Sequence, residues 1–224
     1  AAKRIAWGKT LNAGQTCIAP DYILIHPDIK EEFVKAFGNE IRNLHGEDIK
    51  EHRHYVRMVS DRAFERVSKY LQDGNILYGG RMDASERFIE PTLLEVTDMS
   101  VTVMNEEIFG PVFPVIALEG DFMEEAVKFV NEREKPLAFY YFGREADGWE
   151  YIRRTSSGGG CINDVIMHIA NDRVPFGGVG NSGMGRYHGH ESFDAFSHKR
   201  TVISTGTWID LPFRYMPYKM FSLV

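Results

Sequence analysis

The sequence predicts an α/β fold in which a mostly parallel sheet is flanked by helices. Segments with apolar residues at helical spacing alternate with short apolar runs. Two of these runs, 112–118 and 137–142, are almost continuously apolar, as expected for strands buried on both faces. The 224 residues, 43% of them hydrophobic, are enough for a sizeable core. No linker-like stretch divides the chain, so we predict one main domain at 1–198, followed by a terminal strand and tail at 199–224.

The elements are predicted in order from local spacing and punctuation. Asp28 and Ser60 are good N-cap residues and mark two helix starts. Pro91 suggests that the extended segment around it is an edge strand. The helices are predicted at about 1–12, 29–44, 61–72, 121–132, 145–155 and 192–196. The strands are predicted at about 22–26, 75–78, 88–96, 112–118, 137–142, 161–162 and 201–204.

Composition and charge argue against several classes of function. The net charge is −6, and no run of Lys and Arg is long enough for a nucleic-acid-binding surface. No stretch of about 18 apolar residues is present that would span a membrane. Cys17 and Cys161 are the two cysteines, too few and too far apart for a disulfide framework. We therefore predict a reducing, cytoplasmic environment.

The first candidate for chemistry is Cys17, in the segment Gly14-Gln15-Thr16-Cys17. A flexible approach through Gly14 brings the chain to a thiol just before a predicted strand. This arrangement can present a nucleophile on a rigid element. Taken alone, the spacing favours the alternative, a small buried thiol without a catalytic role.

The second candidate is Glu106-Glu107-Ile108-Phe109-Gly110-Pro111, directly before a predicted buried strand. The Glu107 carboxylate can accept hydrogen bonds from paired ribose hydroxyls, and the Phe109 ring can pack on a flat heterocycle. Both properties suit a nucleotide. The alternative is a solvated acidic pair ahead of a turn, with Phe109 in the core.

Two further patterns are interpreted as structural. Gly178-x-Gly180-x-x-Gly183 matches the spacing of a dinucleotide-binding fingerprint, but no strand leads in and no long helix leads out. We interpret it as a loop that permits close backbone approach and shapes a pocket wall. His52-x-His54 and His188-x-His190 lack a third ligand at a suitable spacing, so no metal site is predicted.

Together and in this order, the motifs resemble the aldehyde dehydrogenase superfamily, and its class 3 branch in particular. The resemblance covers essentially the whole chain and rests on Gly14–Tyr22, Glu106–Pro111, Pro136–Ala138, Gly160–Val165, Pro175–Gly189, Ser192–His198 and the tail near Arg214–Tyr218. It implies that Cys17 is the catalytic thiol, that Glu107 holds the nicotinamide ribose of NAD or NADP, and that Phe109 lies beside the nicotinamide. Aldehydes would be oxidised to carboxylic acids through a thiohemiacetal and a thioester on Cys17. The resemblance also implies a homodimer joined through the strand at 201–204.

The same resemblance implies that this chain is the C-terminal catalytic portion of a longer enzyme. In the family, the general-base Glu, the oxyanion-binding Asn and the Gly-rich cofactor motif all lie upstream of the thiol. We therefore expect the isolated chain to have little or no dehydrogenase activity. Two alternatives stay open: a truncated, non-catalytic interaction module of the same ancestry, and a cysteine-dependent esterase, which would need a base that no spacing reveals.

Overall fold

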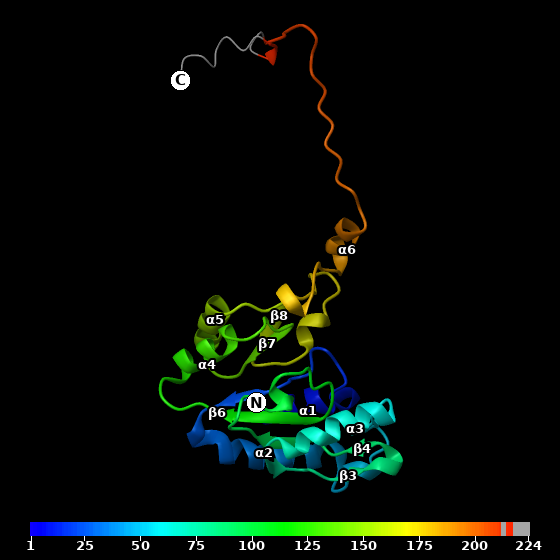
Figure 1. Ribbon diagram of the computed structural model, residues 1–224, viewed down its shortest axis with the longest axis vertical. Helices are drawn as coiled ribbons and strands as arrows, with labels where there is room; N and C mark the ends of the chain where they lie inside the picture. Colours follow the sequence, from blue (N-terminus) through cyan, green and yellow to red (C-terminus); the bar gives the residue numbers. More distant parts are fainter. Residues whose placement is uncertain (212–213, 217–224) are drawn as a thin grey trace.

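A four-stranded sheet lies at the centre of the larger part of the molecule (Figure 1). The computed structural model describes residues 1–211 and 214–216. The strand order is β1 (Ile23–Ile25), β6 (Val112–Ala117), β5 (Thr92–Glu95) and β2 (Asn75–Tyr78). β1 and β5 both pair parallel to β6, whereas β2 pairs antiparallel to β5. The predicted α/β fold with a mostly parallel sheet is confirmed.

Burial of β6 follows from its position between two parallel partners. Val112, Phe113 and Val115 have no exposed surface, and Ile116 is 4% exposed. The ring of Phe113 packs against Phe37 of α2 (Pro27–His45), with ring centroids 5.5 Å apart. The interpretation of this run as a strand buried on both faces is therefore confirmed for 112–116, whereas Ala117 is exposed and Leu118 lies outside the strand.

The predicted edge position of the segment 88–96 is wrong for its second half. This segment forms two short strands, and Pro91 lies between them: β4 (Phe88–Ile89) and β5. β4 pairs antiparallel with β3 (Met82–Asp83), while β5 lies inside the main sheet. Pro91 lies outside the hydrogen-bonded residues of both strands, so its missing N–H removes no hydrogen bond between strands. Its presence therefore does not indicate an edge strand.

The helices near the main sheet start largely where the sequence predicts. α1 spans Ala2–Thr10, and α3 spans Asp61–Lys69. The Ser60 hydroxyl accepts from the Ala63 N–H at 3.2 Å, which confirms the predicted cap of α3. The predicted cap at Asp28 is wrong, because α2 starts at Pro27 and its cap is the His26 ring. Proline at the first helical position is favoured there, since its missing N–H would have no partner.

Short 3-10 turns occur at Leu11–Gly14, Ile49–Glu51, Tyr70–Gln72, Ala84–Glu86 and Thr102–Met104.

A separate two-stranded sheet lies above the main one in Figure 1. Its strands, β7 (Ala138–Tyr141) and β8 (Gly159–Ile162), are parallel. α4 (Phe122–Asn131) and α5 (Glu145–Arg154) lie beside it in Figure 1. The strand predicted at 137–142 exists, but it is only half-buried, contrary to the prediction. A two-stranded sheet gives β7 one strand neighbour instead of two.

The chain beyond β8 is irregular, as the sequence predicts. It contains the short turns Met167–Ile169 and Gly180–Ser182 and the helix α6 (Gly189–Ala195). The strand predicted at 201–204 is not formed: within the described residues, this segment has no strand partner. Its Val202 and Ile203 side chains are 73% and 82% exposed. A strand needs a neighbouring backbone to satisfy its N–H and C=O groups, and the described chain offers none there.

The described part of the chain contains no helix with the length and apolar character that a membrane crossing requires. The rest of the predicted tail, residues 212–213 and 217–224, lies outside the described residues.

Candidate active site

Cys17 lies on the surface, at the end of a tightly wound loop between α1 and β1. Asn12, Ala13 and Gly14 have φ values of 51°, 50° and 71°, in the left-handed region. Non-glycine residues adopt this conformation at a cost, and such residues cluster at functional sites. The Cys17 side chain is exposed, while Gln15 and Ile18 on either side are buried. The alternative of a buried structural thiol is therefore wrong.

The buried side chain of Gln15 fixes the loop just before the thiol. Its Nε2 donates to the carbonyls of Asn12, at 3.1 Å, and Arg57, at 3.2 Å. Its Oε1 accepts from the Val59 N–H at 2.9 Å. Every polar atom of the amide therefore has a backbone partner, so the approach to Cys17 is pinned to the segment 57–59. No signal in the sequence assigned this role to Gln15, because its partners Arg57 and Val59 are more than forty positions away.

Two backbone contacts join the Cys17 loop to the second motif. A Cβ atom at Gly14 would collide with the Gly110 carbonyl oxygen, so only glycine permits this approach. The Asp21 carboxylate accepts from the Ile108 N–H at 3.4 Å, across 87 positions of sequence. The structure therefore brings together two motifs that the sequence analysis treated separately.

A buried lysine supports this junction from below. Lys9 of α1 is 1% exposed, its Nζ donates to the Pro20 carbonyl at 2.7 Å, and it lies 4.5 Å from the centroid of the Phe113 ring. Burial lowers the pKa of Lys9 to about 8, and Asp21 partly offsets this shift. Burial likewise raises the pKa of Asp21, against the opposing effect of Lys9. At both groups the cost of losing water outweighs the attraction of the opposite charge. Charged groups with pKa values shifted in this way are common near functional sites.

Glu107 and Phe109 both face outward from the second motif. Burial raises the pKa of Glu107, Asp21 raises it further, and Arg66 lowers it. The Phe109 ring is 39% exposed and its φ is 44°, whereas Ile108 between the two is fully buried. The alternative with Phe109 in the core is therefore wrong. Both side chains are accessible to a flat, hydroxyl-bearing ligand.

α3 and the turn after it hold this motif through its backbone. Arg66 donates to the carbonyls of Glu107, at 3.1 Å, and Ile108, at 2.8 Å. The Tyr70 hydroxyl donates to a Glu106 carboxylate oxygen at 2.8 Å. Glu106 and Glu107 are both exposed, and the Glu106 carboxylate is held by its hydrogen bond from Tyr70.

The glycine-rich loop makes the close backbone approach that the sequence predicts. Phe176 and Tyr187 exchange backbone hydrogen bonds of 2.9 and 3.0 Å across its base. A Cβ atom at Gly178 would collide with the Ser182 carbonyl, so this is a tight turn. Neither a preceding strand nor a long following helix accompanies it, in agreement with its rejection as a dinucleotide fingerprint. In residues 1–211 and 214–216, no three His, Cys, Asp or Glu side chains are placed to hold a metal ion.

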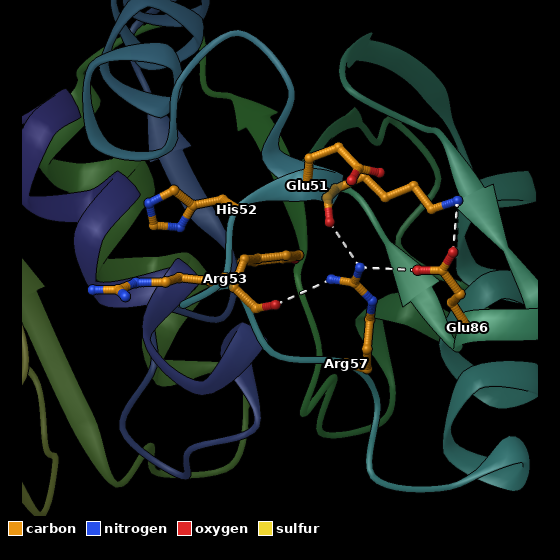
Figure 2. A pocket seen from close by; sticks show the side chains of 7 residues that line it. Glu51, His52, Arg53, Arg57 and Glu86 are labelled. Atoms are coloured by element: carbon orange, nitrogen blue, oxygen red, sulfur yellow. Dashed lines mark hydrogen bonds and ion pairs between the residues drawn. The ribbon is translucent and has the colours of Figure 1, made fainter.

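Two hollows in the described surface lie apart from Cys17. Figure 2 shows the first, of about 440 Å³, which is lined by Lys50, Glu51, His52, Arg53, Tyr55, Arg57 and Glu86. Its charges largely satisfy one another: Lys50 lies 2.7 Å from Asp83, and Arg57 lies 3.0 Å from Glu86. The second, of about 400 Å³, borders Arg66, Tyr70 and Glu106. Among the residues that line the first hollow, Arg57 supports the Cys17 loop, because its carbonyl accepts from Gln15.

Comparison with known proteins places this chain in a family. The aldehyde dehydrogenase family matches residues 1–202. The chain therefore belongs to the aldehyde dehydrogenase family, and the predicted resemblance is confirmed.

The relatives place it near the class 3 branch. The dimeric NADP-preferring aldehyde dehydrogenase of Rattus norvegicus is 48% identical over 204 residues, which cover 91% of this chain and 45% of that protein. Aldehyde dehydrogenase family 3 member A2 of Mus musculus is 46% identical over 210 residues, covering 92% and 42%. The substrate-bound structure of Staphylococcus aureus AldH superposes with a TM-score of 0.85 at 41% identity, covering 95% and 48%. This chain thus spans a little under half the length of these relatives.

Proposed function

We propose that this chain supplies the catalytic portion of an NAD(P)-dependent aldehyde dehydrogenase, with Cys17 as the nucleophile. One observation carries the proposal: the exposed thiol and the outward Glu107 and Phe109 belong to loops joined by the Gly14–Gly110 and Asp21–Ile108 contacts. Glu107 would accept from the ribose hydroxyls of the cofactor, and Phe109 would pack beside its nicotinamide ring. The nicotinamide cofactor is supported by relatives whose names include NADP preference.

The proposed chemistry needs few groups from this chain. The Cys17 thiolate attacks the carbonyl carbon of an aldehyde, and the resulting oxyanion accepts from the Cys17 backbone N–H. A nicotinamide cofactor, held by Glu107 and Phe109, would supply the acceptor for the hydride that leaves that carbon. Water then hydrolyses the Cys17 thioester and releases a carboxylic acid. The general base and the second oxyanion donor would come from outside this chain, so we propose that the isolated chain has little or no dehydrogenase activity.

The test joins this chain to the upstream half of Staphylococcus aureus AldH in one polypeptide. We expect NAD(P)H formation with a simple aldehyde such as hexanal, and a loss of about 10³-fold or more on Cys17→Ser. Cys161→Ser is the matched control and should leave turnover unchanged. Undiminished turnover in Cys17→Ser would overturn the assignment of the nucleophile. Rapid NAD(P)⁺-dependent turnover by the 224-residue chain alone would overturn the need for an upstream half.

We also propose a homodimer that uses the segment 199–224. The segment exposes three large apolar side chains: Val202 at 73%, Ile203 at 82% and Trp208 at 85%. Apolar side chains that lie exposed near one another along the chain favour association. A relative whose name includes "dimeric" supports this. Light scattering should give about twice the 25.6 kDa chain mass, and Ile203→Asp should reduce it to the monomer. A monomer at every concentration would contradict both the dimer and the alternative of an interaction module.

The cellular location and the esterase alternative are also open to test. We propose a cytoplasmic location, because Cys17 and Cys161 are both free thiols and such thiols persist in a reducing compartment. Fractionation of the source cells checks it. The esterase alternative requires ester hydrolysis that depends on Cys17, and equal hydrolysis by Cys17→Ser would remove it.

A further inference from the structure

Tyr140 of β7 reaches across the molecule to the loop that carries Cys17. Its hydroxyl donates to the Ile18 carbonyl at 2.7 Å, and the two residues are 122 positions apart. Ile18 is 2% exposed and directly follows Cys17. Without this donor, the buried carbonyl would lose its partner, which is costly in a protein interior.

The bonded carbonyl belongs to the turn that presents the thiol. The Ala19 N–H donates to the Thr16 carbonyl at 2.9 Å, so Thr16–Ala19 forms a β-turn with Cys17 and Ile18 at its centre. The local hydrogen bond closes this turn, but it does not orient the turn relative to the rest of the protein. The bond from Tyr140 supplies that orientation at the residue next to the thiol.

Tyr140 is itself held at a junction of segments. Its ring packs edge-on against His168, with centroids 5.8 Å apart. The backbone N–H of Ile166 is close enough to lower the pKa of its hydroxyl, against the larger effect of burial. Ile166 has a φ of 66°, an uncommon value for a β-branched residue, which persists only where the surroundings hold it. Burial raises the pKa of Tyr140 well above its ordinary value, and the Cys161 and Cys17 thiols both add to this shift. The hydroxyl therefore keeps its proton, and hence its donor role, throughout the physiological pH range.

We propose that Tyr140 is a positioning residue for the Cys17 thiol, which it orients by fixing the Ile18 carbonyl. The inference rests on the proposed function, in which Cys17 is the nucleophile. Loss of the donor frees the turn to tilt, so the thiol and the Cys17 N–H no longer approach a carbonyl group in one fixed geometry. Misplacement of reacting groups by about 1 Å can reduce a rate by up to about 10²-fold.

The test measures acylation of Cys17 in the 224-residue chain by 4-nitrophenyl acetate. The thiolate attacks the ester carbonyl, 4-nitrophenolate leaves, and peptide mass mapping quantifies acetyl-Cys17. We expect Tyr140→Phe to slow this step about tenfold. Tyr55→Phe is the matched control, because the Tyr55 hydroxyl makes a similar buried bond, 2.8 Å to the Ile89 carbonyl. It should destabilise the fold comparably and leave Cys17 acylation unchanged.

A pair of non-natural side chains separates positioning from packing. At position 140, 4-aminophenylalanine keeps an N–H donor, whereas 4-methylphenylalanine fills the same space without one. The first should restore the Cys17 rate and the second should not, with folding checked by circular dichroism; this pair also decides the matter if Tyr140→Phe does not fold. Equal rates in all variants would overturn the positioning role and leave the proposed function standing. Absence of Cys17 acylation in the unsubstituted chain would overturn the positioning role, whereas the proposed function is tested separately by Cys17→Ser in the joined polypeptide.

Discussion

Two lysines, Lys9 and Lys50, feel nearby carboxylates in opposite environments, and their pKa values move in opposite directions. Lys9 lies buried beneath the Cys17 loop, where loss of water lowers its pKa to about 8 despite the nearby Asp21. Lys50 lies in the hollow of Figure 2, where hydrogen bonds to Asp83 and Glu86 raise its pKa. Desolvation dominates at the first site and hydrogen bonding at the second.

The difference shows where the protein bears an energetic cost. The cluster of Lys50, Arg57, Asp83 and Glu86 is satisfied within itself and screened by water, so it contributes little to stability. The junction beneath Cys17 combines two imperfectly compensated charges with left-handed backbone at Asn12 and Ala13. Such costs concentrate at functional sites because function requires the geometry.

The largest effect is expected for Gly14→Ala, at the contact between the two motifs. The new Cβ would collide with the Gly110 carbonyl, and φ is 71° there, so strain and steric conflict add to about 3–4 kcal/mol of lost stability. Gly46→Ala is the matched control, because φ is 81° but no atom lies within 4 Å of the new Cβ. It should cost about 1–2 kcal/mol, from backbone strain alone. Urea unfolding measures both, and equal losses would show that the contact does not constrain the site.

A smaller effect is expected for Lys9→Met, compared with Lys50→Met. Loss of Lys9 leaves the Asp21 carboxylate without its cation in a poorly hydrated position, at a cost of about 2–3 kcal/mol. Lys50→Met should leave the urea midpoint essentially unchanged, because the charges around it are hydrated. Circular dichroism at a series of urea concentrations provides the measurement. If Lys50→Met proved the more damaging substitution, the contrast between buried and surface pairs would be wrong.

The smallest effect concerns His45, a partly buried group at the margin of the surface cluster. Its Nδ1 lies 3.3 Å from that of His52, and burial, with His52 adding, lowers its pKa to about 4. The unfolded chain binds this proton below about pH 6.5, while the folded chain does so only near pH 4. Stability should therefore fall as the pH decreases through this window, by about 1 kcal/mol after allowing for solvent screening.

His45→Gln removes this titration and is the direct check. Urea midpoints at pH 7 and pH 4.5 should differ less for His45→Gln than for the unsubstituted chain. Parallel changes in the two proteins would show that burial does not keep the His45 ring neutral.

Local patterns accounted for most of the elements, while partners distant in sequence accounted for the errors. Helical spacing and the Ser60 cap located α3, and the apolar run at 112–118 located β6, because these signals lie within a few residues. Pro91 was misinterpreted because its effect depends on which strands pair beside it. The segment 201–204 has the composition of a strand, but pairing requires an edge that the described chain does not provide.

The α/β class, the family resemblance, and the choice of Cys17, Glu107 and Phe109 followed from motifs and periodicity, which are local properties of the sequence. The exposure of the Cys17 thiol and the contact between Gly14 and Gly110 became visible in the folded chain alone. The hydrogen bonds by which Gln15 and Tyr140 hold the turn around the thiol also became visible only there. These features depend on hydrogen bonds and contacts between segments as much as 122 positions apart, and no local pattern encodes such pairings.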